Sequence, residues 1–544
     1  MPQAKRFSSL SFEDEETIYA VSTPKGKAGI AVIRISGSSC LDIYKSLCPS
    51  KQLPKPRYAA VRTIYKPSPS TNISGIGGSS GDCKDVEILD TSSLVLYFPS
   101  PKTVTGEDVL ELHIHGGSAT VKAVLDAIPK SHSPSGRIRY ADPGEFTRRA
   151  FLNGRLDLAQ VESLSDTLDA ETEQQRRAAV RGQSGKLGEK YNHWRDELLY
   201  ARAEIEALID FSEDQHFDES PEDLLSSTLG FIRRIVDMIK IHEEASRRSE
   251  LLRSGIMIAL VGPPNVGKSS LMNLIVGREA SIVSHEAGTT RDIIEASLDI
   301  RGYLCSFADT AGLRGEKMVQ DERKKTIGDI EKEGIRRARR KALESDVVIV
   351  VASLEKNDKG GIYLKYDPET LDIAAKASKS LLVINKTDLL DYALPSSTVL
   401  DKFEAGLSTI GGLRKGIPIL QISCVAATES DNLNAIGGKQ RKDPGGINSV
   451  VDTLVQAFSQ MTNLPADLQG LLGVTTRQAQ LLSECRTHLE MVLDETSQMN
   501  EREGGLDIVL VAEHLRIAAG FLAKLTGRGE AGDVEEVLGV IFEK

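Results

Sequence analysis

The residues with the clearest chemistry in this sequence form a glycine-rich loop between an apolar run and a helix-like stretch. The loop reads Gly-Pro-Pro-Asn-Val-Gly-Lys-Ser over 262–269, after the strand-like run 257–261 and before the helix-like stretch 270–276. In this pattern backbone N–H groups bind phosphate, a lysine reaches the β- and γ-phosphates, and a serine hydroxyl binds Mg²⁺. Lys268 and Ser269 occupy those two positions, so the loop predicts a nucleoside triphosphate site.

A second motif predicts which base is bound. The tetrad Asn-Lys-Thr-Asp over 385–388 directly follows the apolar run 381–384. The carboxylate of Asp388 can accept the N1–H and N2–H₂ groups of guanine, whereas adenine has no donors in that place. The base is therefore predicted to be guanine. Ile-Ser-Cys-Val over 422–425 is predicted to be the second base loop, although such loops usually read Ser-Ala-Lys.

Two further segments have the pattern of switches that respond to the γ-phosphate. Asp-Thr-Ala-Gly over 309–312 supplies a carboxylate for Mg²⁺ through water and a glycine N–H for the γ-phosphate. Thr289 and Thr290 offer the hydroxyl that closes on Mg²⁺ when the triphosphate is bound. Such segments order with the triphosphate and relax after hydrolysis.

Two residues depart from the common pattern of small GTPases. Many of these enzymes place a glutamine after the switch glycine to orient the attacking water, but here the residue is Leu313, which has no polar group. Another residue, within 314–340, is therefore expected to orient the water. Asn265 is the second departure, because its amide oxygen can bind a monovalent cation that offsets the charge developing during hydrolysis.

Composition limits the classes of function. The chain has 544 residues, of which 40% are hydrophobic and 27% charged, and no apolar run is long enough to span a membrane. Its net charge of −11 argues against sequence-independent binding of nucleic acid. The six cysteines lie far apart without a CxxC pair, so we expect neither a disulfide framework nor a zinc site. His113 and His115 have metal-compatible spacing, but polar strand positions are the favoured interpretation.

The elements that must position these residues fall into three kinds of domain. Strand-like runs over 1–153 predict an α+β domain, whereas 154–248 and 464–544 have apolar residues at helical spacing. Over 249–463 strands alternate with helices, which predicts a parallel sheet. The fold class is therefore multidomain: an N-terminal α+β domain and a helical bundle domain into which an α/β phosphate-loop GTPase domain is inserted.

These motifs resemble those of the tRNA modification GTPases that act on the wobble uridine. The α/β domain is similar in 262–271, 277–284, 288–292 and 309–314. The more specific likeness lies outside it, in Pro-Gly-Glu-Phe-Thr-Arg-Arg-Ala-Phe-Leu-Asn-Gly-Arg over 143–155. The segments Ile33–Gly37, Thr105–Glu111 and Asp157–Gln160 extend it. Family chains usually end in Phe-Cys-x-Gly-Lys, whereas this sequence ends in Ile541-Phe542-Glu543-Lys544, which leaves open whether that tail is lost by truncation or naturally absent.

The resemblance implies a role for each part. The front domain is expected to dimerise and to bind a one-carbon derivative of tetrahydrofolate through Arg34, Glu111 and Arg155, because two cations and a carboxylate suit an anionic folate. The GTPase domain is expected to dimerise in a potassium-dependent manner, with K⁺ ligands at Asn265, Ser284, Glu286 and Thr289. The family's catalytic glutamate precedes a Gly-Ile-x-Arg-Ala segment by three residues, which assigns it to Glu331 here, with Glu333 as its neighbour.

Motifs and resemblance together predict the ligand-binding residues. Ser269 and Thr290 are the predicted Mg²⁺ ligands. The predicted GTP-binding residues are Asn265, Val266, Gly267, Lys268, Ser269, Ser270, Ser284, Thr289, Thr290, Asp309, Thr310, Ala311, Gly312, Asn385, Lys386, Asp388 and Ser423.

The resemblance also implies an activity and a setting. It predicts GTP hydrolysis coupled to addition of a carboxymethylaminomethyl-type group at C5 of uridine 34 in tRNA. The chain would act as a homodimer that forms a heterotetramer with an FAD-containing partner. The alternative is a ribosome-assembly GTPase that switches affinity for rRNA. The family's distribution points to the mitochondrial matrix, although the N-terminal residues, with Lys5 and Arg6, are not diagnostic of a targeting signal.

Overall fold

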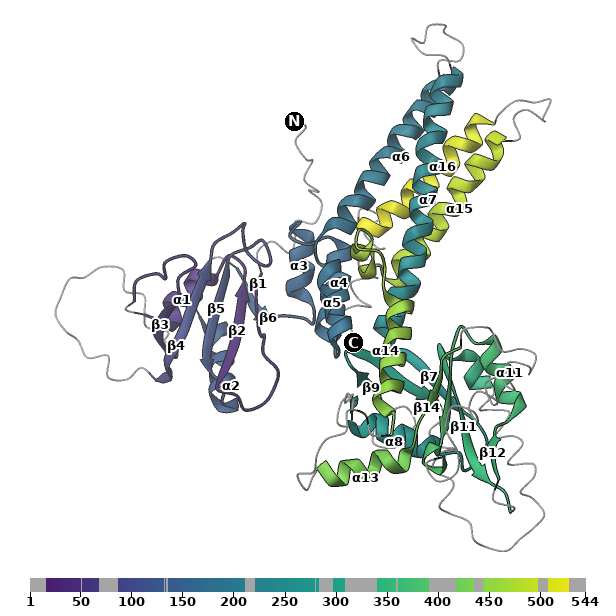
Figure 1. Cartoon of the computed structure of the whole chain (residues 1–544). Coiled ribbons are helices and arrows are strands. Elements are labelled where there is room, and N and C mark those ends of the chain that lie inside the picture. Colours follow the sequence, from purple (N-terminus) through teal and green to yellow (C-terminus); the bar gives the residue numbers. More distant parts are fainter. Residues whose placement is uncertain are drawn as a thin grey trace, which may run out of the picture. The chain divides into compact units, whose positions relative to one another are not determined.

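A computed structural model describes most of the chain as two compact units (Figure 1). Unit 1 comprises Met1–Val161 and Ala523–Lys544, and unit 2 comprises Glu162–Leu522. The described residues are 16–49, 51–67, 87–131, 133, 136–210, 221–278, 280–282, 297–308, 340–358, 361–390, 417–434, 443, 445–497 and 507–527. None of the helices in that part of the chain is both long and apolar enough to cross a membrane.

Among the described residues, unit 1 is built around a six-stranded sheet with the strand order β3-β4-β5-β2-β1-β6. Its strand pairs are antiparallel except for β1 with β6. The strands are β1 (Thr17–Val21), β2 (Ile30–Ser36), β3 (Ala60–Tyr65), β4 (Ile88–Phe98), β5 (Val109–His115) and β6 (Ile138–Tyr140).

Alternating side chains give this sheet one core-forming face. Ile33 and Ile35 of β2 are buried with Leu110, Leu112 and Ile114 of β5 in a core that also takes in helices α1 (Cys40–Leu47) and α2 (Ser118–Ala127). Because successive side chains of a strand point to opposite faces, residues 34 and 111 lie on the other face. The register places them directly opposite each other.

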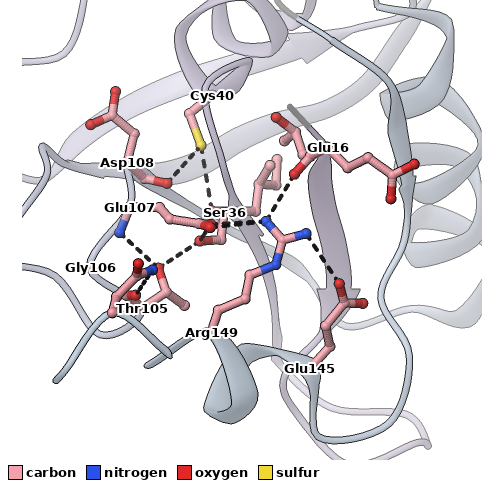
Figure 2. A network of polar contacts seen from close by, with 12 residues as sticks. Glu16, Ser36, Cys40, Thr105, Gly106, Glu107, Asp108, Glu145 and Arg149 are labelled. Atoms are coloured by element: carbon pink, nitrogen blue, oxygen red, sulfur yellow. Dashed lines mark hydrogen bonds and ion pairs between the residues drawn. The ribbon is translucent and has the colours of Figure 1, made fainter. Parts of the chain in front are cut away.

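One buried arginine ties helix α3 to this sheet (Figure 2). Arg149, on α3 (Glu145–Leu152), donates from Nη1 to both carboxylate oxygens of Glu107, at 3.0 and 3.1 Å, and to the backbone oxygen of Glu16 at 2.8 Å. Its Nη2 donates to Glu145 at 3.1 Å. Ser36, at the end of β2, donates to Glu107 at 2.8 Å. The two front-domain motifs singled out in the sequence therefore meet in a charged network, where they hold elements together.

In unit 2 a helical layer combines segments that come before and after the α/β domain in the sequence. Its helices are α5 (Glu173–Gly182), α6 (Lys186–Asp210), α7 (Pro221–Ser254), η4 (Gln469–Gly473) and α15 (Thr476–Ser497). Helices α4 (Leu158–Asp169) and α16 (Ile508–Thr526) continue across the division between the units. The long α6 and α7 contain the two helical patterns expected in the first half, and α15 and α16 those expected in the second.

Polar contacts join the segments before and after the α/β domain. The carboxylate of Glu162 on α4 accepts hydrogen bonds from Arg477 and Gln478 on α15. Within the segment before the domain, Arg253 at the end of α7 donates to both carboxylate oxygens of Asp166 on α4, at 3.0 and 2.7 Å. Gly473 approaches α5 so closely that a Cβ there would lie 2.6 Å from the Cα of Gly182. The α/β domain therefore interrupts a helical layer that closes around its insertion point.

The inserted domain is a twisted α/β sheet in the order β14-β13-β11-β7-β10-β9-β8, with β12 paired to β11. The neighbours from β10 through β7, β11 and β13 to β14 are parallel. Its strands are β7 (Ile256–Val261), β8 (Ala280–Ile282), β9 (Ser297–Ile300), β10 (Tyr303–Ala308), β11 (Val347–Lys356), β12 (Ile362–Lys365), β13 (Lys379–Asn385) and β14 (Ile419–Gln421).

The central strands of this sheet are buried on both faces. Residues 347–354 of β11 are all buried, as expected of a parallel strand covered on both sides. Among the described residues, the helices of this domain are α8 (Lys268–Arg278), α11 (Pro368–Lys376), α13 (Cys424–Asn434) and α14 (Ile447–Thr462). The predicted combination of an α+β domain, a helical domain and an inserted α/β domain is confirmed.

The network at Arg149 predicts a selective loss of stability. Replacing Arg149 with methionine leaves the partly buried Glu107 without its charged partner, whereas Glu145 keeps Arg139 at 2.7 Å. We expect the free energy of unfolding to fall by about 3 kcal/mol in urea titrations. The control is Arg137→Met, since that side chain is 77% exposed and lies 3.6 Å from Glu16. Its effect should stay below about 1 kcal/mol. Equal losses in the two variants would contradict this role of Arg149.

Candidate functional site

The glycine-rich loop connects β7 to α8 through backbone that two glycines make possible. Gly262 has φ +148° and a Cβ there would lie 2.2 Å from the carbonyl oxygen of Val351 on β11. Gly267 has φ +98° and a Cβ there would lie 2.2 Å from Nδ2 of Asn385. Any larger residue at either position would displace backbone or a buried amide. The loop is therefore packed tightly between β11 and the end of β13.

The lysine of the motif folds back over its own loop. Lys268, the first residue of α8, donates from Nζ to the carbonyl oxygens of Gly262 at 3.0 Å and Pro263 at 2.8 Å. Ser269 and Ser270 follow in the first turn of the helix, where unpaired N–H groups and the helix dipole favour an anion. Val266 is fully buried and anchors the loop. This arrangement places a cation and a helix N-terminus around the position predicted for phosphate.

One buried amide joins this loop to both base-binding segments. Asn385, 3% exposed at the end of β13, donates from Nδ2 to the carbonyl oxygen of Val266 at 2.8 Å. Its Oδ1 accepts the backbone N–H of Cys424 at 3.2 Å. Three segments far apart in the sequence are thus held together by one side chain.

The predicted guanine-binding carboxylate is also held in place. Asp388 accepts a hydrogen bond at 2.6 Å from the hydroxyl of Ser423, and that hydroxyl accepts the backbone N–H of Ala426 at 3.2 Å. Thr387 donates from its backbone and its hydroxyl to the carbonyl of Ile422, at 3.1 and 2.9 Å. The structure therefore brings 385–388 and 422–425 together as the sequence led us to expect.

Lys386 has a partner that the sequence did not indicate. Its Nζ lies 2.7 Å from Oε1 of Glu355, near the end of β11. The hydrogen bond from Lys386 lowers the pKa of the Glu355 carboxyl, so this pair stays charged at neutral pH. No motif marks Glu355, because the contact depends on β11 and β13 being neighbours in the sheet.

Cys424 occupies the second base loop as a structural residue. It begins α13 and is buried, and burial raises the pKa of its thiol to about 11. The thiol is therefore protonated at neutral pH. Its backbone N–H, which bonds to Asn385, makes the contribution that any residue at this position can make.

Several predicted residues lie outside the described part of the chain. They are the switch threonines Thr289 and Thr290, the segment Asp309, Thr310, Ala311 and Gly312, the K⁺ ligands Ser284 and Glu286, and the catalytic candidate Glu331. Leu313 and Glu333 lie there as well. Their roles stay predictions.

Of the three predicted folate ligands, two form a pair. Arg34 donates from Nε to Oε1 of Glu111 at 3.0 Å, and its Nη2 lies 3.0 Å from the same oxygen. His113 lies 3.5 Å from the other oxygen of that carboxylate. Arg155 instead donates to the carbonyl oxygen of Thr103 at 2.9 Å. The sheet thus presents a charged pair on the face opposite its core.

The histidines of β5 have carboxylate partners. The ring of His115 lies 2.8 Å from Oδ1 of the buried Asp90, whose Oδ2 accepts the His115 backbone N–H. Among described residues there is no group of three or more His, Cys, Asp or Glu side chains that would hold a metal ion.

Comparisons with known proteins extend over nearly the whole chain. Residues 17–155 match the family model described as GTP-binding protein TrmE N-terminus, and residues 158–544 match that of the MnmE helical domain. The chain is 35% identical to the "tRNA modification GTPase MSS1, mitochondrial" of Saccharomyces cerevisiae, over 99% of this chain and 95% of that protein.

Two other relatives are also similar to this chain over nearly its whole length. The chain is 36% identical to "tRNA modification GTPase MnmE" of Paramagnetospirillum magneticum, over 97% of this chain and 98% of that protein. It is 34% identical to the human "5-taurinomethyluridine-[tRNA] synthase subunit GTPB3, mitochondrial", over 97% of this chain and 92% of that protein.

The bridging amide of Asn385 predicts a loss of nucleotide affinity on truncation. Asn385→Ala leaves a buried carbonyl at Val266 and a buried N–H at Cys424 without their partner. We expect guanine nucleotide affinity to fall roughly tenfold or more, with a loss of about 1–3 kcal/mol in unfolding free energy. Equilibrium binding of GDP and urea unfolding measure the two effects. The control is Asn463→Ala, an exposed asparagine at the end of α14, and a matching change in that variant would contradict the bridging role.

Proposed function

Because the chain belongs to the family of tRNA modification GTPases, we propose that it hydrolyses GTP in the course of modifying the wobble uridine of tRNA. The observation that carries this proposal is the joint placement of the phosphate loop and the 385–388 tetrad by Asn385, in a chain that matches its relatives over nearly their full length. The modification we propose is a carboxymethylaminomethyl-type group at C5 of uridine 34.

The described residues fit a guanine nucleotide with its magnesium ion. Asp388, steadied by Ser423, would accept the donors of the guanine edge, and Lys268 would meet the β- and γ-phosphates. Ser269 and Thr290 would hold Mg²⁺, which neutralises charge on the phosphates when bound. The other GTP ligands proposed are those expected from the sequence. The close packing at Gly262 and Gly267 leaves little room for other residues in the loop.

We further propose that K⁺ and Glu331 take the places of the usual arginine finger and glutamine. Asn265 has φ +63°, which is a left-handed backbone conformation. Its amide oxygen, with Ser284, Glu286 and Thr289, would bind K⁺ beside the phosphates. Glu331 would orient the attacking water, a task that Leu313 cannot perform.

The front domain is proposed to bind a one-carbon derivative of tetrahydrofolate. Arg34 and Glu111 form a partly accessible charged pair, with 28% and 15% of their side chains exposed, which fits a ligand that has both carboxylates and N–H donors. Arg155 would add a second cation by leaving the carbonyl of Thr103. Bound folate would supply the one-carbon unit, while these residues bind and orient it.

Partners and setting follow from the same family membership. We propose a homodimer that joins an FAD-containing partner in a heterotetramer and acts on tRNA. The domain limits proposed are 1–153, 154–248, 249–463 and 464–544. Location in the mitochondrial matrix is proposed because the yeast and human relatives are named as mitochondrial, although a bacterial relative is equally similar.

The potassium and glutamate mechanism predicts a salt-specific activity. GTP turnover by the wild-type protein should be roughly tenfold or more faster in KCl than in NaCl of equal ionic strength. Glu331→Gln should lower kcat about a hundredfold in KCl, because the water loses the group that orients it. Glu333→Gln is the matched control and should stay near wild type. Equal rates in the two salts, or a larger loss in the Glu333 variant, would refute the assignment.

The modification role predicts a change in tRNA itself. Cells that lack this chain should lose the C5 modification at uridine 34, and the loss should be visible by mass spectrometry of nucleosides from purified tRNAs. Re-expression of the wild-type chain should restore it, whereas Lys268→Ala should not, because the phosphates lose their cation. Unmodified nucleosides in the wild type, or identical nucleosides in both cells, would favour the ribosome-assembly alternative.

A further inference from the structure

Two consecutive positions near the start of the predicted phosphate loop have no backbone N–H group. Pro263 and Pro264 follow Gly262, and proline has no backbone N–H. The first donor after Gly262 is therefore the N–H of Asn265. This N–H shares one planar peptide unit with the carbonyl of Pro264, and in a trans peptide the two groups point in opposite directions.

A second lysine, from outside the loop, binds the far end of that same peptide unit. Nζ of Lys365 donates to the carbonyl oxygen of Pro264 at 3.2 Å. Lys268 covers the two preceding carbonyls, so the carbonyls of residues 262, 263 and 264 each accept a hydrogen bond from an ammonium group. Lys365 is the last residue of β12 and lies outside every nucleotide-binding motif in the sequence.

The β11–β12 hairpin holds Lys365 in this position. β12 pairs antiparallel with β11, with Lys365 opposite Ser353 and Ile362 opposite Lys356. β11 also pairs with β7, the strand that leads into the loop. Glu355 on the same hairpin binds Lys386 at 2.7 Å and accepts from Ser353 at 3.2 Å. The hairpin therefore contacts both the predicted phosphate loop, through Lys365, and the predicted base-binding tetrad, through Glu355.

A cation bound to a peptide carbonyl increases the hydrogen-bond donor strength of the N–H in the same peptide. Hydrogen-bonded groups polarise one another, so an ammonium at the Pro264 oxygen makes the Asn265 N–H a stronger donor toward an anion. The ammonium also adds a full positive charge close to the loop, and its effect grows with the negative charge of the ligand. A triphosphate has one more phosphate group than a diphosphate, so it gains more from this charge.

We propose that Lys365 is a positioning residue of the nucleotide site, which acts through the Pro264–Asn265 peptide to favour the triphosphate over the diphosphate. The proposal rests on the function proposed above, because it takes the loop to be a guanine nucleotide site. It assigns the β11–β12 hairpin a role in setting the preference between GTP and GDP.

The test compares two nucleotides and three variants of the full-length protein. Dissociation constants are measured for GDP and for the non-hydrolysable analogue guanosine 5′-(β,γ-imido)triphosphate. Lys365→Gln should weaken binding of the analogue roughly fivefold more than binding of GDP. Lys365→Arg, which keeps the charge, should retain the wild-type ratio. Lys356→Gln removes the same charge from an exposed position on the same hairpin and is the matched control.

Each outcome decides the question. A lower ratio in Lys365→Gln alone supports the proposal. Equal weakening of both nucleotides would mean that the lysine only steadies the loop and would overturn it, as would equal effects of Lys365→Gln and Lys356→Gln. Wild-type protein that binds neither nucleotide would overturn the proposed function itself, before any variant is compared.

Discussion

The nucleotide half of this molecule depends on one buried hydrogen-bonding group, the amide of Asn385. Its two ends bind the carbonyl of Val266 and the N–H of Cys424, so it joins the phosphate loop to the second base loop. Both backbone groups would be costly to leave unpaired in a buried place. Because a Cβ at Gly267 would collide with this amide, the position of Asn385 requires a glycine at 267. The segments predicted to bind phosphate and base are therefore held together by one side chain.

The front domain uses charge in two different ways. Arg149 is buried among Glu107, Glu145 and the backbone of Glu16, and its bonds to Glu107 and Glu16 hold α3 against the sheet (Figure 2). The pair of Arg34 and Glu111 lies on the face opposite the core and is partly accessible. A buried network of this kind is stabilising only while complete, whereas an accessible pair can exchange partners with a ligand. This difference separates the structural motif from the proposed binding motif.

The helical layer explains how an α/β domain is accommodated within it. Glu162 on α4 binds Arg477 and Gln478 on α15, which joins the two helical halves. Arg253 at the end of α7 binds Asp166 on α4, next to the point where the inserted domain begins. The described contacts hold the two ends of the inserted domain close to the same few helices. Helix α14 of the inserted domain contacts α7 of the helical layer. A conformational change inside the domain can therefore be transmitted to this layer, as a switch requires.

The sequence by itself determined the order of domains, the phosphate loop, the guanine tetrad and the strands and helices that carry them, because these are encoded by local patterns. A glycine-rich turn, an apolar run or a helical repeat constrains the backbone near it, so 262–269 and 385–388 were recognisable without a structure. Only the tertiary structure decided which distant side chains complete the site. Glu355 reaches Lys386 and Lys365 reaches Pro264 because β11 lies between β7 and β13, and Arg149 reaches Glu107 because α3 folds back on the sheet. Strand order and long-range packing have no local signature, since they result from the burial of many side chains at once.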